Sequence, residues 1–150
     1  MNSEARKCFR LVQKGRYFGE TAVLDDGKAF ATLSFGVPLK VGAIKCGAEL
    51  YEVVQAGVFS KGLRLFHNGS VLTETPIDVA TGTFILNGSR YLFRHPKLLR
   101  DGVEVGFVEW KWLNPEAEAE FAIDVHIVAC LFAMWLSTRS RIDQIANPPG

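Results

Sequence analysis

Cysteine is scarce in this sequence, and the three residues present, Cys8, Cys46 and Cys130, lie far apart. An odd number with no CxxC pair and no metal-ligand spacing argues against a disulfide framework and against a structural zinc site. An excess of charge of one sign is also lacking, with 17 Lys and Arg against 16 Asp and Glu. Because nucleic-acid-binding proteins normally carry a basic excess, we expect no nucleic-acid partner.

Recognisable catalytic motifs are missing as well. The sequence contains no Gly-rich phosphate loop, no Walker pattern and no Gly-x-Ser-x-Gly elbow. The segment after Met1, NSEARKCFRLV, has neither an apolar core nor a small-residue cleavage site, so we predict no secretory signal and a cytoplasmic location. The sequence thus gives no support to an enzyme, and we assign no catalytic residue, cofactor or metal.

Short β-forming runs and turn signals make up most of the chain. Its 150 residues are enough for one domain with a sizeable core, so we predict a single domain over 1–150. Asn-Gly and Asp-Gly pairs, which supply the positive φ angles of tight hairpins, separate the runs. The turn signals are Asp25-Asp26-Gly27, Lys61-Gly62, Asn68-Gly69, Asn87-Gly88 and Asp101-Gly102. Strands at this spacing predict an antiparallel β-barrel over residues 7–113.

The run VEVGFVEWKWL contains a change of phase. The apolar residues switch parity between Phe107 and Val108, which predicts a β-bulge beside Gly106. After the switch, the apolar residues are the even-numbered ones, so Trp110 and Trp112 are expected to point into the core.

The chain ends in a hydrophobic segment that we predict to be a helix over residues 115–142, followed by a flexible tail over 144–150. Asn114 can cap this helix and Pro115 suits its first turn. The acidic residues that would complement the positive end of the helix dipole are Glu116, Glu118 and Glu120.

Apolar residues fall on every side of this helix, so it must be buried either in lipid or inside the protein. The unbroken apolar run, residues 127–136, is only ten long, whereas a membrane span needs about 20. Extending the run to Phe121 takes in Asp124 and His126. We therefore favour a barrel that encloses the helix, and keep a membrane tail-anchor as the alternative.

The segments VLDDGKAFATLSF, LRLFHNGSVLTE and LLRDGVEVGFVEW, followed by AEFAIDVHIVACLFAMWL, resemble the tubby C-terminal-like barrel family. This family includes tubby proteins, phospholipid scramblases and LURP-one-related proteins. The resemblance covers about residues 7–143 and rests on the pattern of strands, turns and one hydrophobic helix. It implies a barrel around a central helix and binding of lipid headgroups.

Three polar residues of the terminal segment were considered for chemistry. His126 and Cys130 are four apart, which would place a thiol and an imidazole on one helix face. An activated thiolate needs an orienting group and an open cleft, so we favour a buried structural thiol. Asp124 has no partner carboxylate on its face, and we expect it to bond loop amides at the barrel mouth.

Four basic residues lie close together in the run RYLFRHPKLLR: Arg90, Arg94, Lys97 and Arg100. In a strand, Arg90 and Arg94 share the face opposite Tyr91 and Phe93. One interpretation is an anion site, which agrees with what the family resemblance implies. The other is a solvated face whose cations pair with Glu104 and Glu109.

We therefore expect a non-catalytic tubby-like or LURP-one-related module that binds phospholipid or another anionic ligand at its surface, with membrane association through that ligand. Two alternatives stay open. One is the tail-anchored β-domain, and the other is a small-ligand carrier or enzyme with a cavity beside the helix. The sequence indicates neither the ligand nor the oligomeric state.

Overall fold

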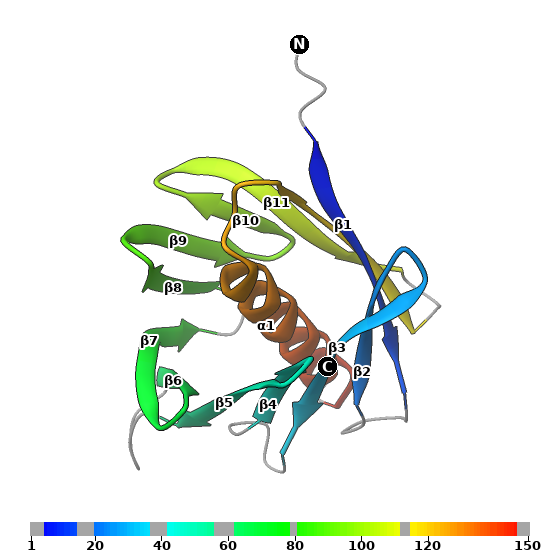
Figure 1. The fold of residues 1–150 in the computed structure, drawn as a ribbon, viewed down its shortest axis with the longest axis horizontal. Helices are drawn as coiled ribbons and strands as arrows, with labels where there is room; N and C mark the ends of the chain where they lie inside the picture. The colour runs from blue at the N-terminus through cyan, green and yellow to red at the C-terminus, as the bar shows by residue number, and fades with distance from the viewer. Residues whose placement is uncertain are drawn as a thin grey trace.

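Twelve antiparallel strands form a closed barrel around one helix (Figure 1), which confirms the predicted fold class. This computed structural model describes residues 5–14, 20–36, 42–55, 62–78, 81–111 and 115–146. The strands are β1 (Arg6–Gln13), β2 (Thr21–Asp25), β3 (Lys28–Phe35), β4 (Gly42–Cys46), β5 (Glu49–Gln55), β6 (Gly62–His67), β7 (Ser70–Asp78), β8 (Thr81–Leu86), β9 (Ser89–Arg94), β10 (Lys97–Arg100), β11 (Val103–Trp110) and β12 (Glu116–Ala122). The helix, α1, spans Ile127–Ala146.

Each strand pairs with the next along the chain, and β1 pairs with β12 to close the barrel. The closing ladder runs from Arg6 opposite Ala122 to Val12 opposite Glu116. The first and last strands therefore lie side by side.

Four of the predicted hairpin turns are confirmed. At each, an Asp or Asn with φ of 51–52° precedes a Gly with φ of 78–85°. Two positive φ angles in succession define the turn that matches the twist of a hairpin. The turns are Asp26-Gly27, Asn68-Gly69, Asn87-Gly88 and Asp101-Gly102. Lys61, in the fifth predicted turn, lies outside the described residues, and the turn at Gly47 (φ 61°) was not predicted.

The predicted start of the helix at residue 115 is wrong. Residues Glu116–Ala122 form β12, and α1 begins at Ile127. Along β12, Ala117, Ala119 and Phe121 are buried, which is the alternation of a strand. Ala and Glu favour helices when considered locally, but pairing with β1 and β11 on both sides overrides that preference.

The ends of α1 differ from prediction in two other respects. Nδ1 of His126, not Asn114, accepts the backbone N–H of Val128 at 3.1 Å and so caps the first turn. Asn114 lies outside the described residues. The helix continues to Ala146, four residues beyond its predicted end and into the predicted tail.

The bulge beside Gly106 is confirmed. Leu98 pairs with Gly106 and Leu99 with Glu104, so Val105 is the extra residue. Trp110 is half-buried and packs against the core, and the guanidinium of Arg141 lies 4.7 Å from the centre of its ring. Trp112 lies outside the described residues.

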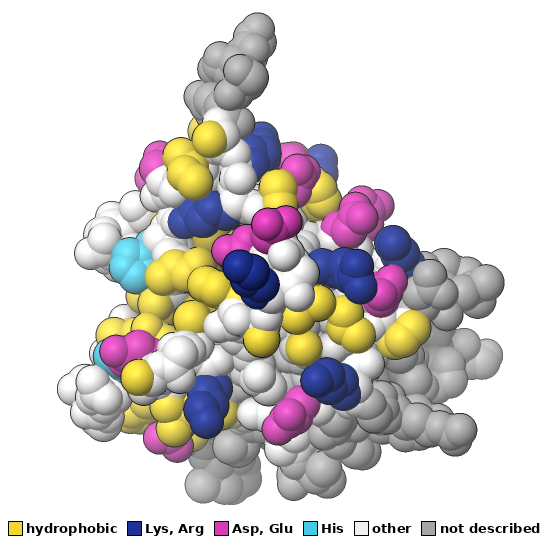
Figure 2. Space-filling view, turned by 45° about the vertical axis from the view of Figure 1, so that its right-hand side comes forward, with side chains coloured by type: hydrophobic (Ala, Val, Ile, Leu, Met, Phe, Trp, Pro, Cys, Tyr) yellow, Lys and Arg dark blue, Asp and Glu magenta, His cyan; other side chains and the backbone are white. Residues whose placement is uncertain are grey.

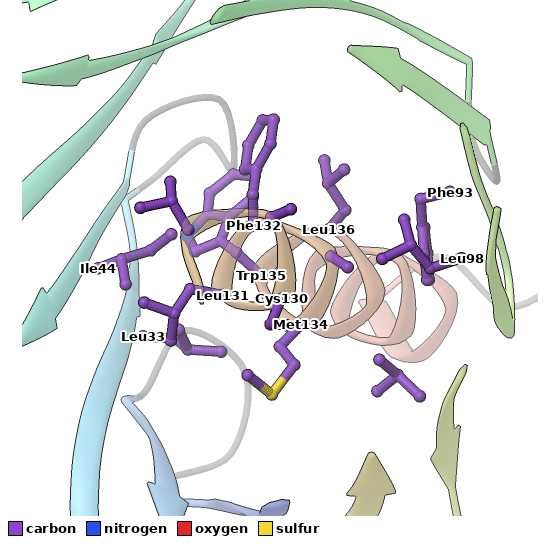
Figure 3. Close-up of a cluster of buried hydrophobic side chains, with 14 of the residues drawn as sticks. Leu33, Ile44, Phe93, Leu98, Cys130, Leu131, Phe132, Met134, Trp135 and Leu136 are labelled. Atoms are coloured by element: carbon purple, nitrogen blue, oxygen red, sulfur yellow. The ribbon is translucent and has the colours of Figure 1, made fainter. Parts of the chain in front are cut away.

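The side chains of α1 fill the barrel. From Val128 to Leu136 every residue is buried, with Leu131 toward Leu33 and Ile44 and Leu136 toward Phe93 and Leu98 (Figure 3). The strands surround the helix, so all its faces meet apolar side chains.

Trp135 anchors the helix to one wall. Its Nε1 donates to the carbonyl of Ser34 at 3.1 Å, and its ring stacks on Phe35 at 5.1 Å. The indole also lies so close to Gly42 that a Cβ there would come within 2.8 Å of it. Gly42 is therefore required by this close approach.

Candidate functional site

The outer face of the β9–β10 hairpin carries three of the four basic residues predicted as an anion site. Phe93 and Leu98 are directly opposite each other and buried, so the neighbouring pair, Arg94 and Lys97, points outward. Arg90 lies on the same outer face, four residues before Arg94 along β9. We call Arg90, Arg94 and Lys97 the basic face.

Arg100 does not belong to this face. It is opposite Tyr91, which is 2% exposed and points into the barrel, so Arg100 leans inward at the rim. Its Nη2 donates to Oδ2 of Asp124 at 2.9 Å. The hydrogen bond to Asp124 raises the pKa of the guanidinium. Since Arg100 already holds a carboxylate that ties β10 to the turn before α1, its role is structural.

The basic face is only partly neutralised. Lys97 forms an ion pair with Glu104 at 3.3 Å, and both side chains are exposed, so the pair contributes little to stability. Neither Arg90 nor Arg94 has an ion-pair partner within the described ranges. Glu109, the other predicted partner, takes part in none of the ion pairs that the described residues form. On the face drawn in Figure 2, basic and acidic side chains are interspersed rather than gathered into a field of one sign.

His95 lies in the turn between β9 and β10, next to the basic face. Its Nδ1 is 3.4 Å from Oγ of Ser137, a buried residue of α1. Burial lowers the pKa of the imidazole, and the nearby Glu109 carboxylate opposes that shift. His95 is therefore neutral at neutral pH and adds no positive charge to the face.

Two hollows lie on the outer surface beside the basic face. One, of about 670 Å³, extends over β8, β9 and β10, with Ile85, Arg90 and Leu99 in its lining. The other, of about 620 Å³, lies between β7 and β8, with Leu72, Ile85 and Arg90 among its lining residues. Sequence analysis missed both, although the exposed apolar position of Ile85 opposite Arg90 follows from strand alternation.

The polar residues Asp124 and Cys130 of the terminal segment have structural roles. Asp124 lies in the turn before α1, where it bonds Arg100 rather than the loop amides that we expected. Cys130 is fully buried, and desolvation raises the pKa of its thiol to about 12, so a thiolate is strongly disfavoured. Within the described ranges, no three His, Cys, Asp or Glu side chains gather as metal ligands would.

No protein-family model, curated protein or solved structure matches this chain. In the part of the chain that the structure describes, none of the helices combines the length and the apolar character that crossing a membrane requires.

Proposed function

We propose that the protein is a non-catalytic binding module that takes a phosphate-bearing anion, such as a phospholipid headgroup, on its basic face. The observation that supports this proposal is the direct pairing of Arg94 with Lys97 across β9 and β10. Like charges placed directly opposite each other destabilise an antiparallel pair. A bound anion between the two side chains would offset that repulsion.

The geometry of the basic face suits more than one anionic group. Arg94 offers a planar fork that matches phosphate oxygens, and Lys97 adds a mobile point charge. Arg90 is four residues from Arg94 along the strand, which is about 13 Å at 3.3 Å per residue. One phosphate therefore engages Arg94 and Lys97, while Arg90 reaches a second anionic group, as at the surface of an acidic bilayer.

The architecture supports kinship with the tubby-like and LURP-one-related barrels. A twelve-stranded antiparallel barrel around one hydrophobic C-terminal helix is what that resemblance implies. Fold alone does not carry function, so the proposal depends on the basic face itself. Reversible attachment of a cytoplasmic protein to an acidic membrane is the form of binding that we propose.

The two alternatives receive less support. A tail-anchored β-domain needs α1 in lipid, whereas the side chains of residues 128–136 are buried among the strands. An enzyme with its site beside the helix needs a reactive group there, whereas burial raises the pKa of the Cys130 thiol and Asp124 is bonded to Arg100. A carrier needs a cavity beside the helix, whereas the two hollows described above lie on the outer surface of the strands.

Liposome co-sedimentation tests the proposal. A triple variant, Arg90→Ser, Arg94→Ser and Lys97→Ser, should lose about 3 kcal/mol of attachment to vesicles containing acidic lipid, or roughly a hundredfold in affinity. A matched variant with the same charge change on the other side of the barrel, Lys14→Ser, Lys28→Ser and Lys45→Ser, should pellet almost like the wild type. Arg100→Ser should also have little effect, because Asp124 already holds its guanidinium.

Further measurements separate a lipid surface from a free anion. Wild-type pelleting should fall as salt is raised, because the field is screened beyond about 8 Å at physiological ionic strength. Competition by soluble inositol phosphates without any binding to vesicles would indicate a free phosphate ligand. Equal pelleting of the triple variant and the matched control would refute the basic face as the binding site.

A further inference from the structure

Exposed apolar side chains gather on the outer wall of the barrel beside the basic face. Six large hydrophobic residues are exposed in the described part of the chain, and three of them, Val71, Leu72 and Ile85, belong to β7 and β8. These two strands and β9 are neighbours on one side of the barrel (Figure 1). A group of exposed apolar residues marks a surface that another molecule covers. We call Val71, Leu72 and Ile85 the apolar patch.

A β-bulge on β7 brings two successive apolar residues to the outer surface. Leu65 of β6 is paired with Thr73 and Phe66 with Val71, so Leu72 is the extra residue. Thr73 is buried, whereas Val71 is 47% exposed and Leu72 is 38% exposed. In a regular strand, one of two neighbouring side chains would point into the barrel. The bulge therefore adds a second apolar side chain to the outside of β7.

The apolar patch is continuous with the basic face. Ile85 is 57% exposed and directly opposite Arg90, so the two side chains leave the wall next to each other. Leu92 lies on the same outer face of β9, midway between Arg90 and Arg94. It is paired with Leu99 of β10, and both line the hollow of about 670 Å³ together with Ile85. Aliphatic and guanidinium side chains therefore share one outer surface.

Two carboxylates lie in the linings of the hollows. Glu74 lines the hollow of about 620 Å³, and its Oε1 is already bonded to Nε of Arg64 at 2.5 Å. Asp101 lines the other hollow, from the tight turn between β10 and β11 at the rim of the barrel. Arg90 lines both hollows and has no ion-pair partner within the described ranges. A ligand that lies across the apolar patch therefore meets an unpaired guanidinium and a neutralised carboxylate.

We infer that this wall of the barrel enters the interface of an acidic bilayer, with the apolar patch at the boundary between headgroups and acyl chains and the basic face on the phosphates. The inference rests on the proposed function and adds to it the hydrocarbon part of the lipid. Arginine and lysine stems lie along apolar surface while their charges reach polar groups, which is the arrangement of side chains at a membrane surface. Three side chains on two strands bury far less than the roughly 800 Å² per partner of a stable protein interface, which favours a bilayer over a second copy of this chain.

Vesicle binding by single variants tests the inference. Leu72→Ser and Ile85→Ser should each weaken attachment to vesicles of phosphatidylcholine and phosphatidylserine about fivefold, at low and at high salt alike, because salt does not screen the burial of an aliphatic side chain. Arg94→Ser should weaken attachment mainly at low salt. Ile123→Ser is the matched control, because Ile123 is 58% exposed but lies in the turn before α1, and it should leave attachment unchanged.

A fluorescent probe measures the depth of each position in the bilayer. The probe is a nitrobenzoxadiazole group attached to Ile85→Cys in a chain that also carries Cys8→Ser and Cys46→Ser. Cys130 is fully buried, so it does not react. On binding to the acidic vesicles, emission should move to shorter wavelength and should be quenched by lipids that carry a nitroxide on the acyl chain. The same probe on Ile123→Cys should remain in water and unquenched.

The outcomes distinguish failure of this inference from failure of the proposed function. Wild-type attachment by Leu72→Ser and Ile85→Ser, with an unquenched probe at position 85, would overturn insertion and leave headgroup binding in place. Equal losses in Ile85→Ser and Ile123→Ser would move the contact to the end of the barrel. A dimer that Ile85→Ser dissociates would assign the patch to a second copy. No attachment of the wild type to acidic vesicles would overturn both proposals.

Discussion

The β1–β12 joint, where the first and last strands pair, and the β7–β8 seam, where β7 and β8 lie side by side, have the longest and the shortest ladders of the barrel wall. In the joint, strands from opposite ends of the chain are paired at seven positions, from Arg6 and Ala122 to Val12 and Glu116. In the seam, consecutive strands are paired at two. Closeness in sequence therefore does not ensure a continuous ladder. A continuous ladder requires that each facing residue can donate and accept a main-chain hydrogen bond and can bury its inward side chain.

The residues of the two regions explain the difference. In the joint, Ala117 and Phe121 point inward from β12 and are fully buried, and Arg10 meets Glu116 at 3.3 Å on the outside. In the seam, Pro76 lacks the donor that the ladder needs, and the inward residues of β7 include Thr73 and Thr75. Apolar alternation and complete donors favour a tight joint, and both are deficient in the seam.

The largest effect is expected from removing the helix, on which both regions pack. A chain that ends after Ala122 retains all twelve strands but loses α1. Burial of side chains such as Leu131, Phe132 and Trp135 is worth roughly 1.5–3 kcal/mol each, against a total stability of about 5–15. We expect no cooperative thermal transition by circular dichroism.

A milder variant keeps this expectation testable if the shortened chain is insoluble. Trp135→Ala should lower the free energy of unfolding by about 3–5 kcal/mol, because it leaves a cavity beside Phe35 and removes the bond to Ser34. A shortened chain that melts cooperatively would show that the strands do not need the helix.

An intermediate effect compares the two regions directly by adding a proline to the joint and removing one from the seam. Ala119 on β12 is paired with Phe9 on one side and Val108 on the other, so Ala119→Pro breaks a ladder and should cost about 3 kcal/mol or more. Pro76→Ala supplies an N–H opposite the C=O of Thr83, so it should change the free energy of unfolding by about 1 kcal/mol or less. Urea unfolding of the two variants gives the difference. Equal losses would show that the ladder at Ala119 contributes no more to stability than the one at Pro76.

The smallest effect is expected at His95, in the turn between β9 and β10. Strand β9 pairs with β8, one of the two strands of the seam. Burial holds the pKa of the folded imidazole below its ordinary value of 6.5. The unfolded chain therefore binds more protons just below pH 6.5, so stability is full above that pH and is lost as pH falls toward the folded pKa. Because the ring is only half-buried, we expect a loss well under about 1 kcal/mol.

The measurement for His95 is the unfolding free energy at pH 7.5 and at pH 5.5. His95→Gln should be less dependent on pH than the wild type across this interval. An identical pH dependence in the two proteins would mean that the imidazole is as solvated in the folded state as in the unfolded one.

Much of the candidate site was predictable, because alternation along a strand is local. The outward position of Arg90 and Arg94 follows from the sequence RYLFR alone. The inward position of Arg100 does not, because a turn at His95-Pro96 resets the phase before β10 begins. Its bond to Asp124 depends on where the turn before α1 meets the rim of the barrel, which no local pattern specifies.

Sequence by itself determined the class of the fold, since Asn-Gly and Asp-Gly turns and apolar runs are local signals, and an all-round apolar helix requires an enclosing wall. Only the tertiary structure decided that EAEAEFA is the closing strand, because its alanines and glutamates suit a helix until β1 and β11 take up its hydrogen bonds. Tertiary structure also decided where the ladder is shortest. Pro76 is visible in the sequence, but its missing donor matters only because the register of β7 and β8 places the C=O of Thr83 across from it.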